Sequence, residues 1–209
     1  MKRGIFGPIA IVEAALVVVF AAAAGFMFYQ GSYITQQVND ELTSQKISFP
    51  AATEIKAGGA LDPATFPQEI RDLAGQQVDN GYKARIYAQD FIRIHEQHIA
   101  NGETYSTMGG KIAAVNAQIA ATPKTDPAYA DLQKQLATMN GQRDTLFKGD
   151  MLRGALLNSY GWWTFGTYMV YGALVALVAA VLALGALAFE VLFAARKPKT
   201  VKVAQRATA

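Results

Sequence analysis

Two long apolar segments dominate the pattern of hydrophobic positions along the chain. The first covers residues 5–29 and contains one charged residue, Glu13. The second covers residues 161–193 and also contains one charged residue, Glu190. A bilayer core about 30 Å thick requires about 20 apolar residues in helical conformation. The pattern therefore predicts two transmembrane helices, one for each segment.

Two other interpretations of these segments are weaker. Helices buried in a soluble protein normally keep a polar face over such a length, and these segments have none. A cleaved signal peptide would fit the basic start Met1-Lys2-Arg3 and the small residues 21–25, but the apolar core of a signal peptide spans only about 7–15 residues. We therefore expect the first segment to be an uncleaved anchor.

Between the two segments, apolar residues recur at three- and four-residue spacing, which is typical of helices. One such stripe runs from Tyr82 to Asn101 and precedes Gly102, a residue suited to a helix C-terminus. Two further stripes flank a break at residues 122–127 and predict an antiparallel helical hairpin over about 110–148. The facing residues of the hairpin are expected to be Ile112, Val115 and Ile119 on one helix and Leu132, Leu136 and Met139 on the other.

The other connections are short or rich in helix-breaking residues. Residues 46–50 alternate in polarity and end in proline, which predicts an extended connector. A loop follows over residues 51–67, where glycine and proline recur. Residues 68–77 fit a short helix, and Asp79-Asn80-Gly81 is typical of a turn.

The sequence thus predicts a mainly α fold in which two transmembrane helices flank a mostly helical extracytoplasmic domain with a helical hairpin. Residues 1–4 would form a cytoplasmic N-terminus and residues 5–29 the first transmembrane helix. Residues 30–160 would form the extracytoplasmic domain, residues 161–193 the second transmembrane helix, and residues 194–209 a basic cytoplasmic tail.

Composition and charge narrow the range of functions. Of the 209 residues, 52% are hydrophobic, 17% are charged and none is cysteine, which excludes a disulfide-stapled domain and a thiolate metal site. The net charge is +3, yet residues 30–160 hold more acidic than basic side chains. The basic excess flanks the apolar segments, at Lys2, Arg3, Arg196, Lys197, Lys199, Lys202 and Arg206. This distribution predicts an inner (plasma) membrane protein with both termini in the cytoplasm, and not a nucleic-acid-binding surface.

The two histidines are the first candidates for chemistry. His95 and His98 lie at i and i+3 on a predicted helix, so they could hold a metal together, with Glu103 or Asp90 as an oxygen ligand. The order H-E-x-H differs from the H-E-x-x-H of zinc proteases, and histidines on an apolar face are more often structural. Because no nucleophile motif, Walker loop or dinucleotide fingerprint occurs, the sequence predicts no enzymatic activity and no cofactor.

The two carboxylates of the apolar segments are the second candidates. Charged side chains in a bilayer core are costly and normally face protein or water. Glu190 lies close to Arg196 in the sequence, so we expect its carboxylate to reach the cytoplasmic surface. Glu13 would lie about 10 Å inside the membrane. Neither segment supplies a basic residue, so we expect the partner of Glu13 to be a neutral donor, water or another subunit.

Several short motifs occur in the same order as in a known family. They are Ala88-Gln89, His95, Gly102-Glu103-Thr104-Tyr105, Arg143, and Leu152-Arg153-Gly154-Ala155-Leu156. Over about half of its length the chain resembles, in these motifs, a family of small actinobacterial two-span membrane proteins. It differs by having Asn101-Gly102 where a glycine pair is usual, and by a helical insertion at residues 110–140. Members often carry the automatic name of ring-opening dioxygenase, which the residues do not support, since only His95 and His98 could begin an iron site. The resemblance implies a bacterial cell-envelope protein of unassigned activity.

Together these observations predict a non-enzymatic accessory subunit of a bacterial membrane protein complex, such as a respiratory or other membrane oxidoreductase assembly. The expected partners are other integral membrane subunits and membrane lipid. The expected interaction residues are Glu13, Glu190, Ile112, Leu132 and Leu136. The alternative is an extracytoplasmic protein that binds a metal or small ligand through His95 and His98, and a homo-oligomer without a larger partner is a third interpretation.

Overall fold

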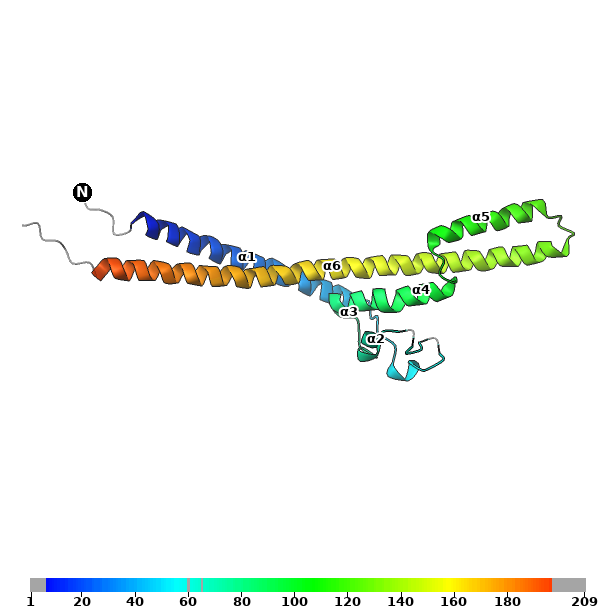
Figure 1. The fold of residues 1–209 in the computed structure, drawn as a ribbon, viewed down its shortest axis with the longest axis horizontal. Coiled ribbons are helices and arrows are strands. Elements are labelled where there is room, and N and C mark those ends of the chain that lie inside the picture. Colours follow the sequence, from blue (N-terminus) through cyan, green and yellow to red (C-terminus); the bar gives the residue numbers. More distant parts are fainter. Residues whose placement is uncertain (1–6, 60, 65, 197–209) are drawn as a thin grey trace, which may run out of the picture. The chain divides into compact units, whose positions relative to one another are not determined.

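The computed structural model describes residues 7–59, 61–64 and 66–196, and within them the protein is mainly helical (Figure 1). The only β pairing among these residues is an isolated antiparallel bridge between Ser48 and Gln77. Lys2, Arg3 and the basic residues after 196, on which the predicted orientation depends, lie outside the described residues. The elements are α1 (Pro8–Ser44), the 3-10 turn η1 (Ala52–Glu54), α2 (Gln68–Asp72), α3 (Gly81–Ile86), the π-helical turn η2 (Tyr87–Ile92), α4 (Arg93–Ile99), α5 (Tyr105–Ala121) and α6 (Pro127–Arg196).

The chain divides into two compact units, which are considered separately. The two-helix unit comprises Met1–Ser32 and Thr167–Ala209, and the domain comprises Tyr33–Gly166. The first part of α1 and the last part of α6 therefore make up the two-helix unit, while the rest of both helices belongs to the domain.

Small side chains line the contact between the helices of the two-helix unit. Ala10, Ala24, Ala173 and Ala180 are buried there, and a Cβ at Gly172 would overlap the Met27 side chain. Close approach through small residues is typical of packed helices in lipid. Most of the remaining surface is apolar and exposed, since only 11% of the most apolar window of each helix is buried. A core helix of a soluble protein would be mostly buried, unlike these two. By length and composition, both helices are long and apolar enough to cross a membrane.

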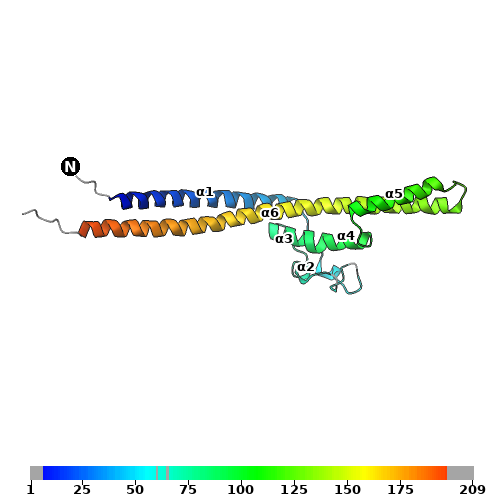
Figure 2. The ribbon, with the colours of Figure 1, turned by 45° about the horizontal axis from the view of Figure 1, so that its top comes forward.

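The core of the domain lies between the α3–α4 segment and the loop that carries α2. Figures 1 and 2 show this segment between α6 and that loop. The loop is closed by backbone hydrogen bonds from Phe49 to Gln76 and from Val78 to Ile47. The buried side chains are Leu42, Phe49, Phe66, Ile70, Val78, Ala84, Ile86, Ala88, Ile92, Ile94 and Leu156. α1 and α6 therefore each supply a residue to a core built mainly from the segment between them.

The helix predicted from Tyr82 to Asn101 is not a single α-helix. The structure has α3 and α4 with the π-helical turn η2 between them. One row of buried side chains explains the difference, because Ala84, Ala88, Ile92, Glu96 and Ala100 recur every four residues, while Ile86 and Ile94 are buried outside this row. In an α-helix with 3.6 residues per turn, such a row would drift by about 40° at each step. A π-helical turn holds more residues per turn, so it keeps the row facing the core.

The start of α3 also differs from the prediction. Residues 79–81 were expected to form a turn, whereas the Asn80 side chain accepts a hydrogen bond from the Lys83 backbone N–H and caps α3. Gly81, the first residue of the helix, lies against Trp163 of α6, and a Cβ there would overlap the indole. The predicted turn is therefore the N-terminus of a helix that packs closely on α6.

The helices predicted on either side of residues 122–127 are both present. α5 starts earlier than the predicted Gly110, because Thr104 caps it by accepting a hydrogen bond from the backbone N–H of Thr107. α6 begins at Pro127, and Asp126 accepts a hydrogen bond from the Ala128 backbone N–H. An acceptor side chain followed by proline at the first helical position is a favourable start.

Candidate functional site

Two glutamates face each other in the two-helix unit. The carboxyl groups of Glu13 on α1 and Glu190 on α6 lie close enough to interact. An ionised carboxylate only accepts hydrogen bonds, so a hydrogen bond between the two groups needs a proton on one of them. The Oε2 atom of each residue is enclosed and has no hydrogen-bond partner among the described residues. The pair is therefore a polar contact between two apolar helices that leaves hydrogen-bonding capacity unused.

An apolar hollow lies on the same unit. It has a volume of about 310 Å³ and is lined by Ala10, Ile11, Ala14, Leu187 and Val191. The lining residues flank Glu13 and Glu190 in the sequence of each helix. Gly7 also lies near the pair, because a Cβ at this position would be 3.6 Å from Oε1 of Glu190. Apolar space and unused carboxyl oxygens thus occur together on these helices.

The structure places Glu190 beside Glu13, a neighbour that the sequence did not indicate. The sequence left a neutral donor, water or another subunit as the partner of Glu13, and it directed Glu190 to the cytoplasmic surface. The two residues meet because Glu13 follows the start of α1 and Glu190 precedes the end of α6. The sequence gives the depth of each residue along its own helix, but not the face that each helix presents to the other.

A second enclosed glutamate lies in the domain, between α4 and α6. Glu96 is 8% exposed and accepts a hydrogen bond from Nη1 of Arg153 at 2.7 Å, and the two form a salt bridge. Nη1 of Arg153 also lies 3.3 Å from Oδ1 of Asp150. α6 approaches Glu96 at Gly149, where a Cβ would overlap the carboxyl group. Glycine at position 149 therefore makes the room in which the carboxylate reaches Arg153.

The charge of Glu96 is set by opposing effects. Burial raises the pKa of the Glu96 carboxyl above its usual value, and the negative charge of Asp150 adds to this. The charge and the hydrogen bond of Arg153 lower the pKa, but less than burial and Asp150 together raise it. Oε1 of Glu96 and Nε of Arg153 have no hydrogen-bond partner among the described residues. The ion pair thus joins α4 to α6 at a cost in desolvation.

Sequence reasoning missed this ion pair. Glu96 and Arg153 are 57 positions apart, so no local pattern connects them. A signal was present in the four-residue repeat of buried positions, because Glu96 is the only ionisable residue in that row. Arg153 gives a second signal, since it is the last charged residue before the long uncharged stretch of α6.

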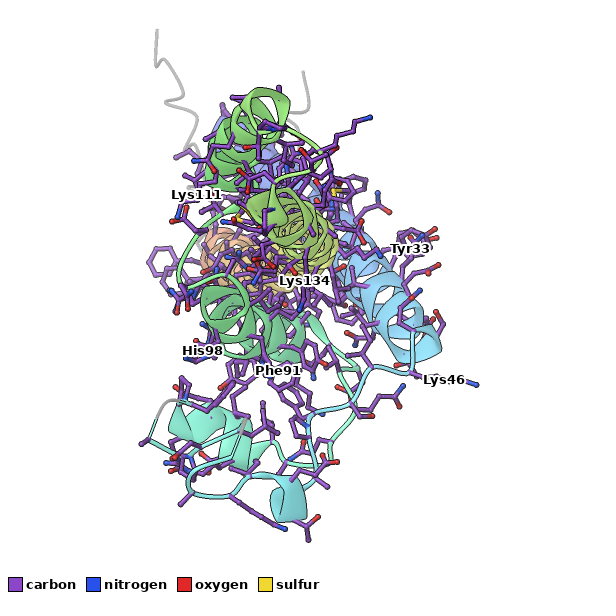
Figure 3. All side chains as sticks on the ribbon, turned by 90° about the vertical axis from the view of Figure 1, so that its right-hand side faces the viewer. Tyr33, Lys46, Phe91, His98, Lys111 and Lys134 are labelled. Atoms are coloured by element: carbon purple, nitrogen blue, oxygen red, sulfur yellow. The ribbon has the colours of Figure 1, made fainter. Side chains whose placement is uncertain are left out.

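His95 belongs to a row of aromatic rings in the domain. Its imidazole lies 4.5 Å from the Phe91 ring and 5.2 Å from the Phe66 ring, measured between centroids. The row continues from Phe91 to Tyr87 at 4.8 Å and from Tyr87 to Phe49 at 5.3 Å. Figure 3 labels Phe91 on the side of the helix that faces the loop carrying α2. Nδ1 of His95 donates a hydrogen bond to the Phe91 carbonyl oxygen at 3.0 Å, since a carbonyl can only accept.

The structure does not gather the proposed metal ligands. His98 is exposed, while Glu103 forms a salt bridge with Lys111 of α5. The hydrogen bond from Lys111 lowers the pKa of Glu103, and a further one from Thr107 adds to this. In the described part of the chain, no group of three or more histidine, aspartate or glutamate side chains could hold a metal ion.

The expected interaction residues of the hairpin lie along its inner side. Val115 is buried, and Ile112, Ile119, Leu132, Leu136 and Met139 are half-buried, while most of their neighbours are exposed. At its base the hairpin packs on the end of α4 through Ala100, Met108 and Leu146. Lys111 and Lys134 extend from the outer surface (Figure 3). These apolar residues hold the hairpin together, and its outer surface is polar.

No protein-family model, no curated protein sequence and no solved structure matches this chain.

Proposed function

We propose that the protein is a non-catalytic accessory subunit of a bacterial membrane protein complex. α1 and α6 would anchor it as two transmembrane helices, with the domain outside the cytoplasm. One observation carries the proposal, namely the surface of the two-helix unit that combines the Glu13–Glu190 pair with the neighbouring apolar hollow. The Glu13–Glu190 and Glu96–Arg153 contacts also support a structural role, since each joins two helices.

A third membrane helix is the partner that fits this surface. Its side chain would fill the hollow lined by Ala10, Ala14 and Leu187. The Oε2 atoms of Glu13 and Glu190 are already enclosed by this chain, so the partner helix would contact the apolar hollow beside the pair and not these atoms.

Photo-crosslinking from two positions on α1 tests the partner. Ile11 lines the hollow, whereas Val18 is 68% exposed and does not. A photoreactive amino acid at position 11 should yield a crosslink to a polypeptide of defined mass in intact membranes. The same amino acid at position 18 is the matched control and should label mainly lipid. Equal polypeptide labelling from both positions, or none from position 11, would contradict the proposal.

Filling the hollow provides a second test. Ala14→Leu places a larger side chain in the space that the partner helix would occupy, so the crosslinked polypeptide should be lost. Val18→Leu adds volume on the exposed surface and should leave the crosslink unchanged. If both variants insert into membranes and both retain the crosslink, the hollow is not the contact.

The orientation is tested by cysteine labelling in intact cells, which the absence of native cysteine makes specific. A cysteine in place of Thr125, between α5 and α6, should react with a membrane-impermeant reagent. A cysteine in place of Lys202, outside the described residues, should be protected until the membrane is opened. The reverse pattern would place both termini outside and contradict the proposed topology.

A further inference from the structure

A crevice lies between α1 and α6 within the domain. It has a volume of about 360 Å³. Its lining residues are Ile34, Gln37, Val38 and Glu41 of α1 and Asn158, Ser159 and Trp162 of α6. All of them belong to the domain, and on both helices they adjoin the apolar stretch in the sequence.

The polarity of the crevice changes along its length, in the same sense on both helices. On α1 the residue nearest the apolar stretch is Ile34, and the farthest is Glu41, about 10 Å along the helix. On α6 the residue nearest the apolar stretch is Trp162, and the farthest is Asn158. One end of the crevice is therefore apolar and the other polar, as a lipid is along the path from its acyl chains to its headgroup.

The polar end is rich in hydrogen-bond acceptors. Glu41 is exposed, and among the described residues no basic side chain forms a salt bridge with it. The amide oxygens of Gln37 and Asn158 are further acceptors in the lining. Ser159 donates its hydroxyl hydrogen to the Ala155 carbonyl at 3.1 Å, which leaves its lone pairs as acceptors. This set matches the three N–H donors of a primary ammonium group.

The indole of Trp162 lies at the apolar end of the crevice. It is 54% exposed and lines the crevice, so it offers an apolar surface to the glycerol and upper acyl chains of a lipid. A phosphate group, in turn, can accept hydrogen bonds from the amide N–H groups of Gln37 and Asn158. The lining thus provides for both charges of a zwitterionic headgroup.

We propose that this crevice binds the headgroup of phosphatidylethanolamine in the extracytoplasmic leaflet. The ammonium group lies at Glu41 and Asn158, and the glycerol and upper acyl chains lie against Ile34 and Trp162. Phosphatidylcholine fits less well because its quaternary ammonium has no N–H to donate. Phosphatidylglycerol fits less well because it places a net negative charge beside Glu41. The site rests on the membrane placement proposed above.

Native mass spectrometry of the full-length protein tests the site. The protein is released from detergent micelles that contain equal amounts of phosphatidylethanolamine, phosphatidylcholine and phosphatidylglycerol with identical acyl chains. Phosphatidylethanolamine should be retained preferentially. Glu41→Gln should lower its retention by about 1.4-fold to fivefold, which corresponds to the 0.2–1 kcal/mol of an exposed ion pair. Asp131→Asn, an exposed carboxylate on the hairpin, is the matched control and should change nothing.

Two more variants separate recognition from a general loss of structure. Glu41→Lys reverses the charge, so phosphatidylglycerol should become the preferred lipid, a gain that misfolding cannot produce. Trp162→Leu should reduce retention of phosphatidylethanolamine, whereas Tyr168→Leu, at a 66% exposed aromatic residue outside the crevice, should not.

Equal retention of the three lipids, or a preference that Glu41→Gln and Glu41→Lys leave unchanged, would overturn the headgroup site. A polypeptide retained in place of lipid and lost in Trp162→Leu would also overturn it. Each of these results leaves the third-helix contact near Glu13 standing, because that contact is tested by crosslinking from position 11.

Discussion

Both units of the protein enclose a glutamate between two helices, but the partners of the two glutamates differ. In the domain, Glu96 meets the guanidinium of Arg153 at 2.7 Å, so opposite charges face each other. In the two-helix unit, Glu13 lies beside Glu190, so two groups of the same kind face each other, and a hydrogen bond between them needs a proton on one. The first contact joins opposite charges, and the second joins two carboxyl groups.

The comparison shows how each setting determines the chemistry that joins its helices. In an enclosed ion pair, the attraction between the two charges offsets the cost of removing them from water. Removing one partner leaves the other charge without this attraction, so it destabilises the protein more than replacing both partners with apolar residues does. A shared proton places at most one net charge between the helices, which suits a segment surrounded by apolar side chains. The two contacts should therefore respond differently when one of their partners is replaced.

The largest effect should follow from removing Arg153. Arg153→Leu leaves the Glu96 carboxylate enclosed without its counter-charge, which should destabilise the domain by about 3–5 kcal/mol. Denaturant-induced unfolding of the detergent-solubilised protein measures this change. The double variant Glu96→Leu/Arg153→Leu is the control and should recover much of the lost stability. A single variant as stable as the native protein would show that the pair carries no such charge interaction.

A smaller loss should follow from closing the space beside Glu96. Gly149→Ala places a Cβ against the carboxyl group and should cost about 1–3 kcal/mol, as overpacking usually does. Gly141→Ala lies on the same helix, with nothing within 4 Å of the added Cβ, and should stabilise by about 0.5–1 kcal/mol. The same unfolding experiment separates the two. If the two alanines act alike, α6 does not depend on glycine at position 149.

The contact between Glu13 and Glu190 in the two-helix unit should be less sensitive to the replacement of one partner. Glu13→Gln keeps a hydrogen-bonding group opposite Glu190 and should change stability little. Glu13→Leu removes the hydrogen bond and should cost about 0.6–2 kcal/mol, the range for hydrogen bonds between membrane helices. Unfolding in mixed micelles measures both variants. A loss in Glu13→Gln as large as that in Arg153→Leu would show that this contact depends on charge after all.

The smallest effect concerns pH and the domain. Burial raises the pKa of Glu96 in the folded state, so the folded domain binds a proton more readily than the unfolded chain does. Its contribution to stability is therefore present at low pH and is lost as the pH rises through the folded-state pKa. Stability should rise slightly as the pH falls from about 7 toward about 5, by less than the effect of Gly149→Ala.

The control for this titration is Glu96→Gln, because glutamine does not titrate. The charged groups that act on Glu96 are Arg153, through a salt bridge, and Asp150, through its negative charge. Melting temperatures of both proteins are recorded at each pH, and the rise should be absent in the variant. At lower pH the hydrogen bonds that lower the pKa of Asp62 and Glu103 act in the opposite sense, since their contribution is lost on protonation. A rise of equal size in both proteins would exclude Glu96 as its source.

The sequence was informative where a regular pattern extends over many residues. The apolar segments exceed the length of a membrane span, and the structure confirms two helices of sufficient length and apolarity. The break before α6 was predicted from Asp126-Pro127, and α6 begins at Pro127. These signals are local, because a cap or a stripe acts through residues within a few positions of one another.

The sequence was less informative where the structure depends on distant residues. The prediction of one continuous helix from Tyr82 to Asn101 assumed a uniform period of 3.6 residues, whereas tertiary packing selects a row of buried side chains four residues apart. Glu13 and Glu190 meet across two helices, and so do Glu96 and Arg153. Such pairs depend on the face that each helix turns to the other, which single-chain periodicity does not determine.

The π-helical turn η2 also determines how the protein tolerates changes of length. Deleting one residue within Tyr87–Ile92 would allow the segment to wind as an ordinary α-helix, because a π-helical turn holds about one residue more than an α-helical turn. Glu96 would then stay opposite Arg153, and Ala100 would keep its contact at the base of the hairpin. A deletion within α3 would instead rotate all that follows by about 100°, so η2 is the place where this segment can lose one residue without changing the faces of the helix that follows.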